Sequence, residues 1–158
     1  MSKHVVMISG YFDICHGSHC EYASNARKLA GPDGLVYAIV NNDEQAYLKK
    51  GYCFVPEKDR LAVIKSLKYV DKAFLSIDLD RSVCETIQMI CDTEKFKPTH
   101  WFNEGDVKPD SPCLEEEVCG NNGIAVVYGE SPKMQSSSWI IKDSVKKAYH
   151  ILYPEILD

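Results

Sequence analysis

Short apolar runs alternate with longer segments of helical periodicity along this chain, and the alternation constrains the fold more than any other feature. Five runs have the length of a buried strand: residues 5–8, 35–40, 73–75, 100–102 and 124–128. The first run is apolar throughout and ends at Ser9-Gly10, which is typical of a strand buried on both faces.

The segments between these runs carry apolar residues at helical spacing. The periodic segments are residues 21–29, 61–67, 83–91 and 141–152. Pro56 marks the start of the second of these helices, and Gly31-Pro32 ends the first. Strands that alternate with amphipathic helices form a parallel sheet covered by helices on both faces. The sequence therefore predicts a single α/β, Rossmann-like domain over residues 1–158, with about five parallel strands and its ligand site in the loops after the strands.

Composition and charge exclude several classes of function. The net charge of −5 over 158 residues disfavours binding to nucleic acid or to an anionic membrane, so any phosphate must be held by a local cluster. The start of the chain resembles neither a signal peptide nor a membrane span. Seven cysteines, an odd number without a C-x-x-C pair, indicate reduced thiols. We expect a cytoplasmic protein that binds neither nucleic acid nor membrane.

The loop after the first strand carries the most informative residues. His16 and His19 are three residues apart where the first helix is expected to begin, so both imidazoles can lie beside the free N–H groups of the helix start. This arrangement suits phosphoryl or nucleotidyl transfer, in which the protein mainly positions groups and stabilises charge. Two other interpretations remain: a zinc cluster with Cys15 and Cys20, or histidines that only pack or cap.

At these residues the chain resembles a known family. Gly10-x-Phe12-Asp13-x-x-His16-x-x-His19 is similar to the G-x-F-D-x-x-H-x-G-H signature of the cytidylyltransferase-like nucleotidyltransferases. Further similar segments follow in the family's order: residues 41–44, Lys49 and Arg60, residues 67–71, residues 103–106 and residues 135–141. Ser18 stands where the family has glycine between the histidines.

The resemblance implies an enzyme that transfers a nucleoside monophosphate to a phosphorylated small molecule and releases pyrophosphate. It implies His16, His19 and Lys49 as catalytic residues and Arg60, with Lys49, as a phosphate or acceptor ligand. The implied nucleotide-binding residues are Gly10, Tyr11, Phe12, Asp13, Asp106, Ser136, Ser137 and Ser138. Asp13 and Asp106 can alternatively serve as turn or cap residues, and Arg60 can pair with Glu57. Tryptophans such as Trp101 and Trp139 are more often core residues than base-stacking groups, and we assign neither a role.

Partners and substrates follow from the same resemblance. We expect Mg²⁺ to arrive with the nucleoside triphosphate rather than in a protein metal site, and we expect a homodimer. CMP transfer from CTP to a polyol, sugar or amino-alcohol phosphate is the first expectation. The alternatives are an adenylyltransferase that uses ATP on a sugar phosphate, and a nucleotide-binding regulator without catalysis, which the Ser18 departure favours.

Overall fold

Five parallel strands form one sheet in the computed structural model, which describes residues 3–105, 110–111, 113–132 and 134–156. The strands are β1 (Val5–Gly10), β2 (Leu35–Val40), β3 (Lys72–Leu75), β4 (His100–Asn103) and β5 (Ala125–Tyr128). Their order in the sheet is β3-β2-β1-β4-β5, and every neighbouring pair is parallel. This confirms the predicted α/β, Rossmann-like fold. The order reverses between β1 and β4, the point where ligands bind in sheets of this kind.

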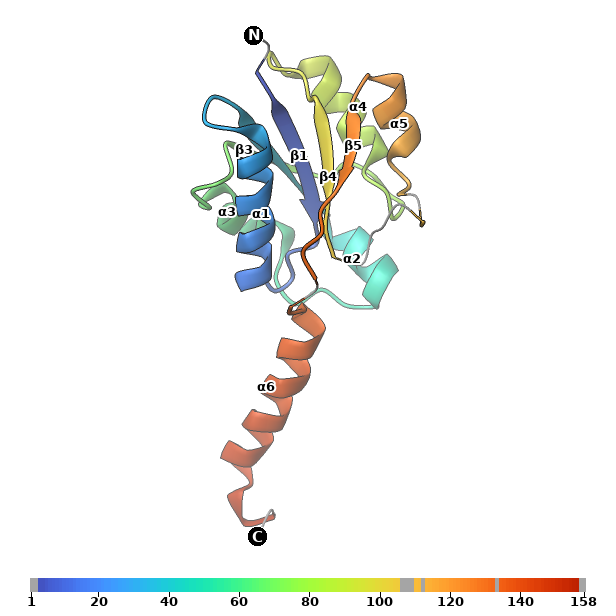
Figure 1. Ribbon diagram of the computed structural model, residues 1–158. Coiled ribbons are helices and arrows are strands. Elements are labelled where there is room, and N and C mark those ends of the chain that lie inside the picture. The colour runs from blue at the N-terminus through green and yellow to red at the C-terminus, as the bar shows by residue number, and fades with distance from the viewer. Residues whose placement is uncertain (1–2, 106–109, 112, 133, 157–158) are drawn as a thin grey trace.

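Helices cover both faces of the sheet (Figure 1). On one face, α1 (Gly17–Ala30) and α3 (Glu57–Lys65) bury Ala23, Ala26 and Ile64 against alternate residues of β1 and β2. On the other face, α4 (Cys84–Thr93) and α5 (Glu116–Asn121) bury Ile87, Ile90 and Cys119 against the remaining ones. Each central strand therefore contributes to two cores, because successive side chains point to opposite faces.

A helix that the sequence analysis missed, α2 (Asp43–Lys50), follows β2 directly. Asn42 and Gln45 form a reciprocal cap, in which the Asn42 side chain accepts from Gln45 N and the Gln45 side chain accepts from Asn42 N. The helix ends at Gly51, whose φ of 80° lies in the left-handed region that favours glycine. Lys49 lies in the last turn of α2.

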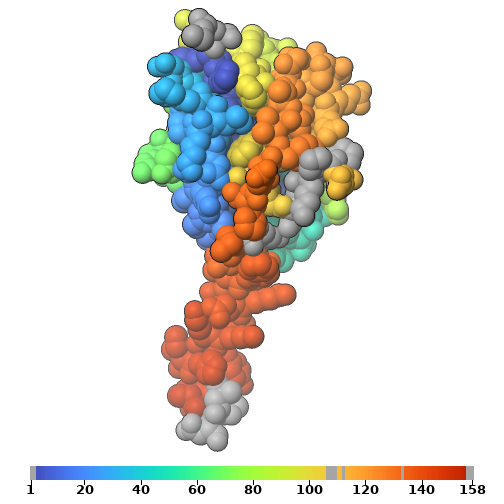
Figure 2. All heavy atoms as spheres, viewed as in Figure 1, coloured from blue at the N-terminus to red at the C-terminus, as the bar shows by residue number. Residues whose placement is uncertain are grey.

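The last helix, α6 (Ser137–Leu152), does not pack on the sheet, and the expectation that it would is wrong. It begins near the carboxyl ends of the strands, projects away from them, and is followed by the short helix η1 (Pro154–Ile156) (Figures 1 and 2). None of its residues is buried, and its apolar residues Trp139 and Val145 are 51% and 64% exposed. Periodicity predicted the helix correctly, but it does not specify what covers the apolar face. No helix within the described part of the chain is long and apolar enough to cross a membrane.

Candidate functional site

The two histidines of the first loop lie together at the start of α1. His16 is the residue that precedes the helix, and His19 is in the first turn. Their rings stack with centroids 3.9 Å apart. His19 Nδ1 accepts a hydrogen bond from the backbone N–H of His16 at 3.2 Å. Because Nδ1 is an acceptor, the proton of a neutral His19 ring is assigned to Nε2, which is then the atom that can donate to a ligand.

Burial keeps both histidines neutral. It lowers the pKa of His16, and it lowers that of His19 to about 4, with smaller contributions from the neighbouring His16 and Lys50. His16 Nδ1 is buried and has no hydrogen-bond partner among the described residues. At neutral pH the pair therefore offers hydrogen bonds rather than positive charge.

The Phe12 side chain packs against the His19 ring instead of facing a ligand. Its side chain is 2% exposed, and its ring meets the His19 ring edge-on with centroids 5.1 Å apart. Gly10 is required for this packing, because a Cβ atom there would lie 2.9 Å from Phe12 Cζ. Gly10 and Phe12 of the predicted nucleotide-binding set are thus placed to position His19, although Gly10 also lines the cavities described next.

A first cavity of about 320 Å³ lies above the histidines, between the carboxyl ends of β1 and β4 and the segment before α6. Its lining includes His16, Ser18, His19, Lys49, Glu104, Ser131 and Gln135. The N-terminal end of α1 opens into it, which gives a favourable environment for an anion. The predicted residues His16, His19 and Lys49 therefore lie around one cavity.

A second cavity of about 240 Å³ adjoins the first on the side of α2 and α4. Its lining includes Tyr11, Asn41, Arg81, Trp101, Asn103 and Glu115. Ser9, Gly10, Tyr22, Lys49 and Glu104 line both cavities. The two cavities thus meet at the end of β1, and each is of a size suited to part of a small-molecule ligand.

Lys49 and Lys50 lie over the Tyr11 ring at this junction. Their Nζ atoms are 4.6 Å and 5.4 Å from the ring centroid, within the range of a cation–π interaction. Lys50 also donates to the backbone oxygen of Asp13 at 3.3 Å. Of these two lysines, only Lys49 lines the cavities.

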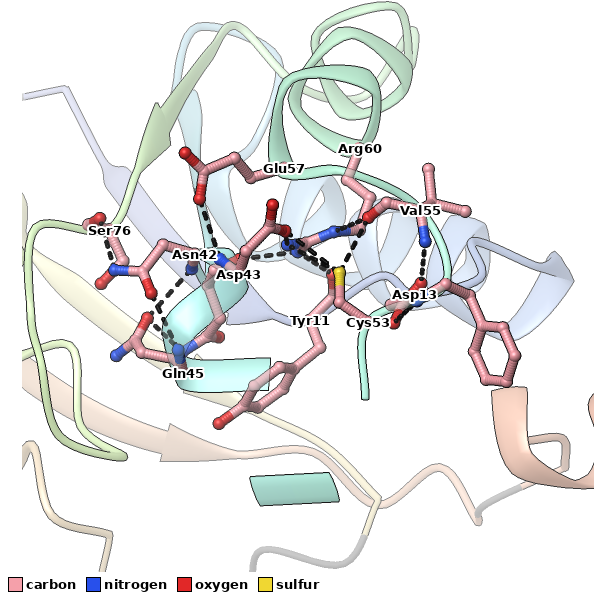
Figure 3. A network of polar contacts seen from close by, with 12 residues as sticks. Tyr11, Asp13, Asn42, Asp43, Gln45, Cys53, Val55, Glu57, Arg60 and Ser76 are labelled. Atoms are coloured by element: carbon pink, nitrogen blue, oxygen red, sulfur yellow. Dashed lines mark hydrogen bonds and ion pairs between the residues drawn. The ribbon is translucent and has the colours of Figure 1, made fainter. Parts of the chain in front are cut away.

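Arg60 occupies the interior instead of a cavity (Figure 3). Its side chain is 1% exposed. The guanidinium donates to the backbone oxygens of Val55, Tyr11 and Asn41 at 2.6–2.7 Å and to the Asp43 carboxylate at 2.7 Å. These contacts hold three loops together and occupy Nε and both terminal nitrogens. We therefore propose no phosphate contact for Arg60.

Asp13 has a similar architectural place. It is 1% exposed, and its two carboxylate oxygens accept from the backbone N–H groups of Phe54 and Val55 at 3.0 and 2.8 Å (Figure 3). This fastens the loop between α2 and α3 to the loop after β1. Of the roles considered from the sequence, the structure places Asp13 in the turn-stabilising one, and Asp13 lines neither cavity.

The serines at the start of α6 lie next to the first loop. Ser136 caps the helix, since its side chain accepts from Trp139 N at 3.3 Å, and it shares a 3.0 Å hydrogen bond with Ser138. Ser137 Oγ donates to the backbone oxygen of Ile14 at 2.8 Å, two residues before His16. None of the three lines a cavity, whereas the preceding Gln135 does. Asp106, the remaining predicted residue, lies outside the described residues.

No group of three or more His, Cys, Asp or Glu side chains in the described ranges is arranged to hold a metal ion. The zinc interpretation of Cys15, His16, His19 and Cys20 therefore has no geometric support. Burial raises the pKa of the Cys15 thiol to about 11, with a contribution from nearby Cys20, so this sulfur is not a ready thiolate ligand.

Several lining residues were missed from the sequence. Trp101 lies on β4 in an apolar run that looks like core, and Arg81 and Glu115 belong to no recognised pattern. Asn103 and Gln135 begin two of the segments that resemble the family, residues 103–106 and 135–141, but were not chosen as site residues. Glu104 was noted only as part of a loop. Its carboxylate accepts from Asn25 at 2.9 Å, and burial raises its pKa. Only its position directly after a strand could have pointed to it.

Comparison with known proteins gives a consistent result. Residues 7–143 match the Cytidylyltransferase-like family. FAD synthase of Methanothermus fervidus is 33% identical over 141 residues, covering 86% of this chain and 91% of the relative. FAD synthase of Korarchaeum cryptofilum is 31% identical, covering 89% and 91%. For FAD synthase of Methanobrevibacter smithii, 40% identity extends over 70 residues, so the chain spans about half of that relative (46%).

A solved structure supports the same placement. The lipopolysaccharide core biosynthesis protein from Thermoplasma volcanium matches with a TM-score of 0.58 and 26% sequence identity, covering 79% of this chain and 93% of that one. The paired histidines at the start of α1, the sheet order and the family match agree. The chain belongs to the cytidylyltransferase-like family.

Proposed function

We propose that this enzyme transfers AMP from MgATP to FMN, which yields FAD and pyrophosphate. The single observation that supports this most is the pair of adjoining cavities that share Lys49 at the end of β1. Two substrates that react with each other need two sites with a common border. The first cavity takes the triphosphate, because the α1 N-terminus and the histidines lie there, and the second takes the acceptor.

The choice of ATP over CTP rests on the relatives. FAD contains an AMP group, so an enzyme named FAD synthase that joins a nucleotide to a flavin phosphate uses an adenine nucleotide. Two relatives with that name match this chain over about nine-tenths of their length. The first expectation from the sequence was CTP, and the alternative was ATP with a sugar phosphate. We now favour ATP with a flavin phosphate, and CTP becomes the alternative.

The chemistry needs alignment more than acid–base catalysis. A phosphate oxygen of the acceptor attacks the α-phosphorus and forms a new P–O bond. The bond from the α-phosphorus to the bridging oxygen breaks, and its electron pair leaves with pyrophosphate. Because the attacking phosphate is already an anion, no general base is required, and charge stabilisation in the transition state is the main task.

Each residue at the border has a part in that task. His16 and the Nε2–H of His19 donate to oxygens of the triphosphate, while Lys49 contacts phosphates of both substrates. The low pKa of His19 means that it donates as a neutral ring at first, and negative charge on the bound nucleotide favours its protonation. Gly10 allows close approach of the backbone. The hydrogen bond from Ser137 to Ile14 holds the start of α6 next to the first loop, where Gln135 lines the same cavity.

Three further expectations stay proposals. Mg²⁺ enters as part of the nucleotide substrate and neutralises the departing pyrophosphate. A homodimer rests on the resemblance to the family, and a cytoplasmic location rests on the odd number of cysteines without a C-x-x-C pair.

The test is a direct assay with separated nucleotides. The protein is incubated with FMN, Mg²⁺ and either ATP or CTP, and both pyrophosphate and the dinucleotide product are quantified. His19→Gln is expected to lower kcat about 10²- to 10³-fold, since it removes a transition-state donor. His4→Gln, which changes a histidine before β1 at the opposite end of the sheet, is the matched control and is expected to retain full activity. Product formed with CTP but not ATP, or with neither, would overturn the proposal.

A further inference from the structure

The second cavity has an unusual hydrogen-bonding inventory. Three buried donors at its wall have no hydrogen-bond partner among the described residues: the Tyr11 hydroxyl, Trp101 Nε1 and Asn103 Nδ2. Trp101 is 1% exposed and Asn103 is 7% exposed, so solvent does not compensate for the missing bonds. Buried polar groups in folded proteins are nearly always paired, so three unpaired donors on residues that line one cavity call for a partner, which a ligand or an ordered water can supply.

The donors come from two different strands or their ends. Trp101 and Asn103 lie on β4, two residues apart and thus on the same face of the sheet, and Tyr11 follows β1. The β1–β4 boundary is the point where the strand order reverses. The three groups are thereby held on rigid elements around one cavity.

Charge around the cavity points to a ligand rich in acceptor atoms. Arg81 and Lys49 add positive groups to the three unpaired donors. Two carboxylates also line the cavity, and both already accept hydrogen bonds: Glu115 from the backbone N–H of Val83 at 3.1 Å, and Glu104 from the Asn25 side chain at 2.9 Å. A cationic ligand group would meet Arg81 and Lys49. A polyol hydroxyl can accept from the same donors, so the aromatic surface of the cavity is what distinguishes a ring from a polyol.

The side chains around the cavity also favour a flat ligand. Tyr11, Tyr22 and Trp101 supply aromatic surface. Aromatic walls with a few placed donors are typical of sites for planar heterocycles.

We propose that the second cavity selects the acceptor by a planar ring with carbonyl-type oxygens or unprotonated ring nitrogens, which accept from Tyr11, Trp101 and Asn103. This rests on the proposed function and makes it more specific, because it assigns acceptor selection to three side chains. It separates a flavin phosphate from polyol, sugar and amino-alcohol phosphates, which lack such a ring. Tyr11 and Asn103 are specificity-determining residues that have no part in contacting the triphosphate.

Two isosteric variants test the assignment. Tyr11→Phe removes only the hydroxyl and keeps the ring under Lys49 and Lys50, and Asn103→Leu removes the amide at similar volume. Tyr69→Phe, a tyrosine between α3 and β3, is the matched control. Binding of riboflavin and FMN without nucleotide is followed by flavin fluorescence, and ribitol 5-phosphate, which is FMN without its ring, serves as competitor.

Wild-type protein and Tyr69→Phe are expected to bind riboflavin and FMN, while ribitol 5-phosphate competes only weakly. Tyr11→Phe and Asn103→Leu are expected to raise the flavin Kd about five- to tenfold and to leave the Kd for ATP unchanged. Their melting temperatures are expected to stay the same or rise, since each variant removes a buried group without a partner. A purely structural role would instead lower the melting temperature and leave the flavin Kd as it is.

The outcomes separate this inference from the proposed function. Flavin binding that weakens in both variants, without turnover of FMN, would support the inference and overturn the proposed function. Wild-type protein that fails to bind flavin, yet transfers AMP to ribitol 5-phosphate, would overturn the inference. A loss of ATP affinity in Tyr11→Phe, with unchanged flavin affinity, would also overturn it.

Discussion

Replacement of Arg60 by leucine is expected to lower the free energy of unfolding and to leave the ATP affinity of the folded protein unchanged. The change removes four hydrogen bonds and leaves the backbone oxygens of Val55, Tyr11 and Asn41 without their donor. Removing one partner from a buried charged network costs about 3–5 kcal/mol. For a domain of 158 residues, a loss of 4 kcal/mol corresponds to a fall in Tm of roughly 8–16 °C.

The assay is urea unfolding followed by the fluorescence of buried Trp101, with ATP affinity measured separately on the folded fraction. Arg60→Lys is expected to lose less stability than Arg60→Leu, because the lysine ammonium can replace some of the hydrogen bonds of the guanidinium, although not all of them. Lys58→Ala, an exposed position on the same helix, is the control and is expected to change stability by about 0.5 kcal/mol or less. Stability within 1 kcal/mol of wild type, together with a tenfold loss of ATP affinity, would refute the structural assignment and restore the phosphate role.

Three further predictions follow from contacts in the same loops. Because the folded His19 pKa of about 4 lies below its ordinary 6.5, wild type should lose stability as pH falls from about 6.5 to 4. By pH 4 the free energy of unfolding of wild type, measured by urea titration, should have fallen by roughly 3 kcal/mol more than that of His19→Gln. The same dependence of stability on pH in both proteins would contradict this prediction. Gly10→Ala places a Cβ atom 2.9 Å from Phe12 Cζ, so calorimetry should show that the free energy of unfolding falls by about 1–3 kcal/mol. The variant should also have a lower kcat, and an unchanged kcat would show that Phe12 does not position His19. Asp13→Asn leaves one of the two backbone N–H groups of Phe54 and Val55 facing an amide NH₂, so the free energy of unfolding should fall by about 1–3 kcal/mol. An unchanged midpoint of urea unfolding would contradict this prediction.

The sheet could be predicted because its strands are buried on both faces. Residues 35–40 are apolar at every position, and such a run has few alternatives to a central strand. The helix α2 was missed because Asn41-Asn42-Asp43 is also typical of a turn, and the cap formed by Asn42 and Gln45 depends on the exact backbone path. The exposed course of α6 could not be predicted either, since periodicity does not identify the surface that a helix meets.

Some residues of the candidate site could also be predicted from the sequence, and others could not. The pair His16 and His19 was recognisable because its spacing is local, three residues at a helix start. Arg60 and Asp13 look like ligand-binding residues in the sequence, but their partners are backbone groups of loops up to 49 residues away, which no local pattern specifies. Trp101 has the sequence context of an ordinary strand residue, and Asn103 begins the loop segment 103–106. Only the packed structure separates a buried side chain that fills the core from one at a cavity wall.

The most direct test of nucleotidyl transfer uses ATP that carries ³²P on either the α- or the γ-phosphorus. With FMN and Mg²⁺, label from the α-position is expected in a product that co-migrates with FAD, and label from the γ-position is expected only in pyrophosphate. Transfer of the γ-label to the acceptor, or retention of the α-label in ATP throughout, would contradict an attack at the α-phosphorus beside His16 and His19.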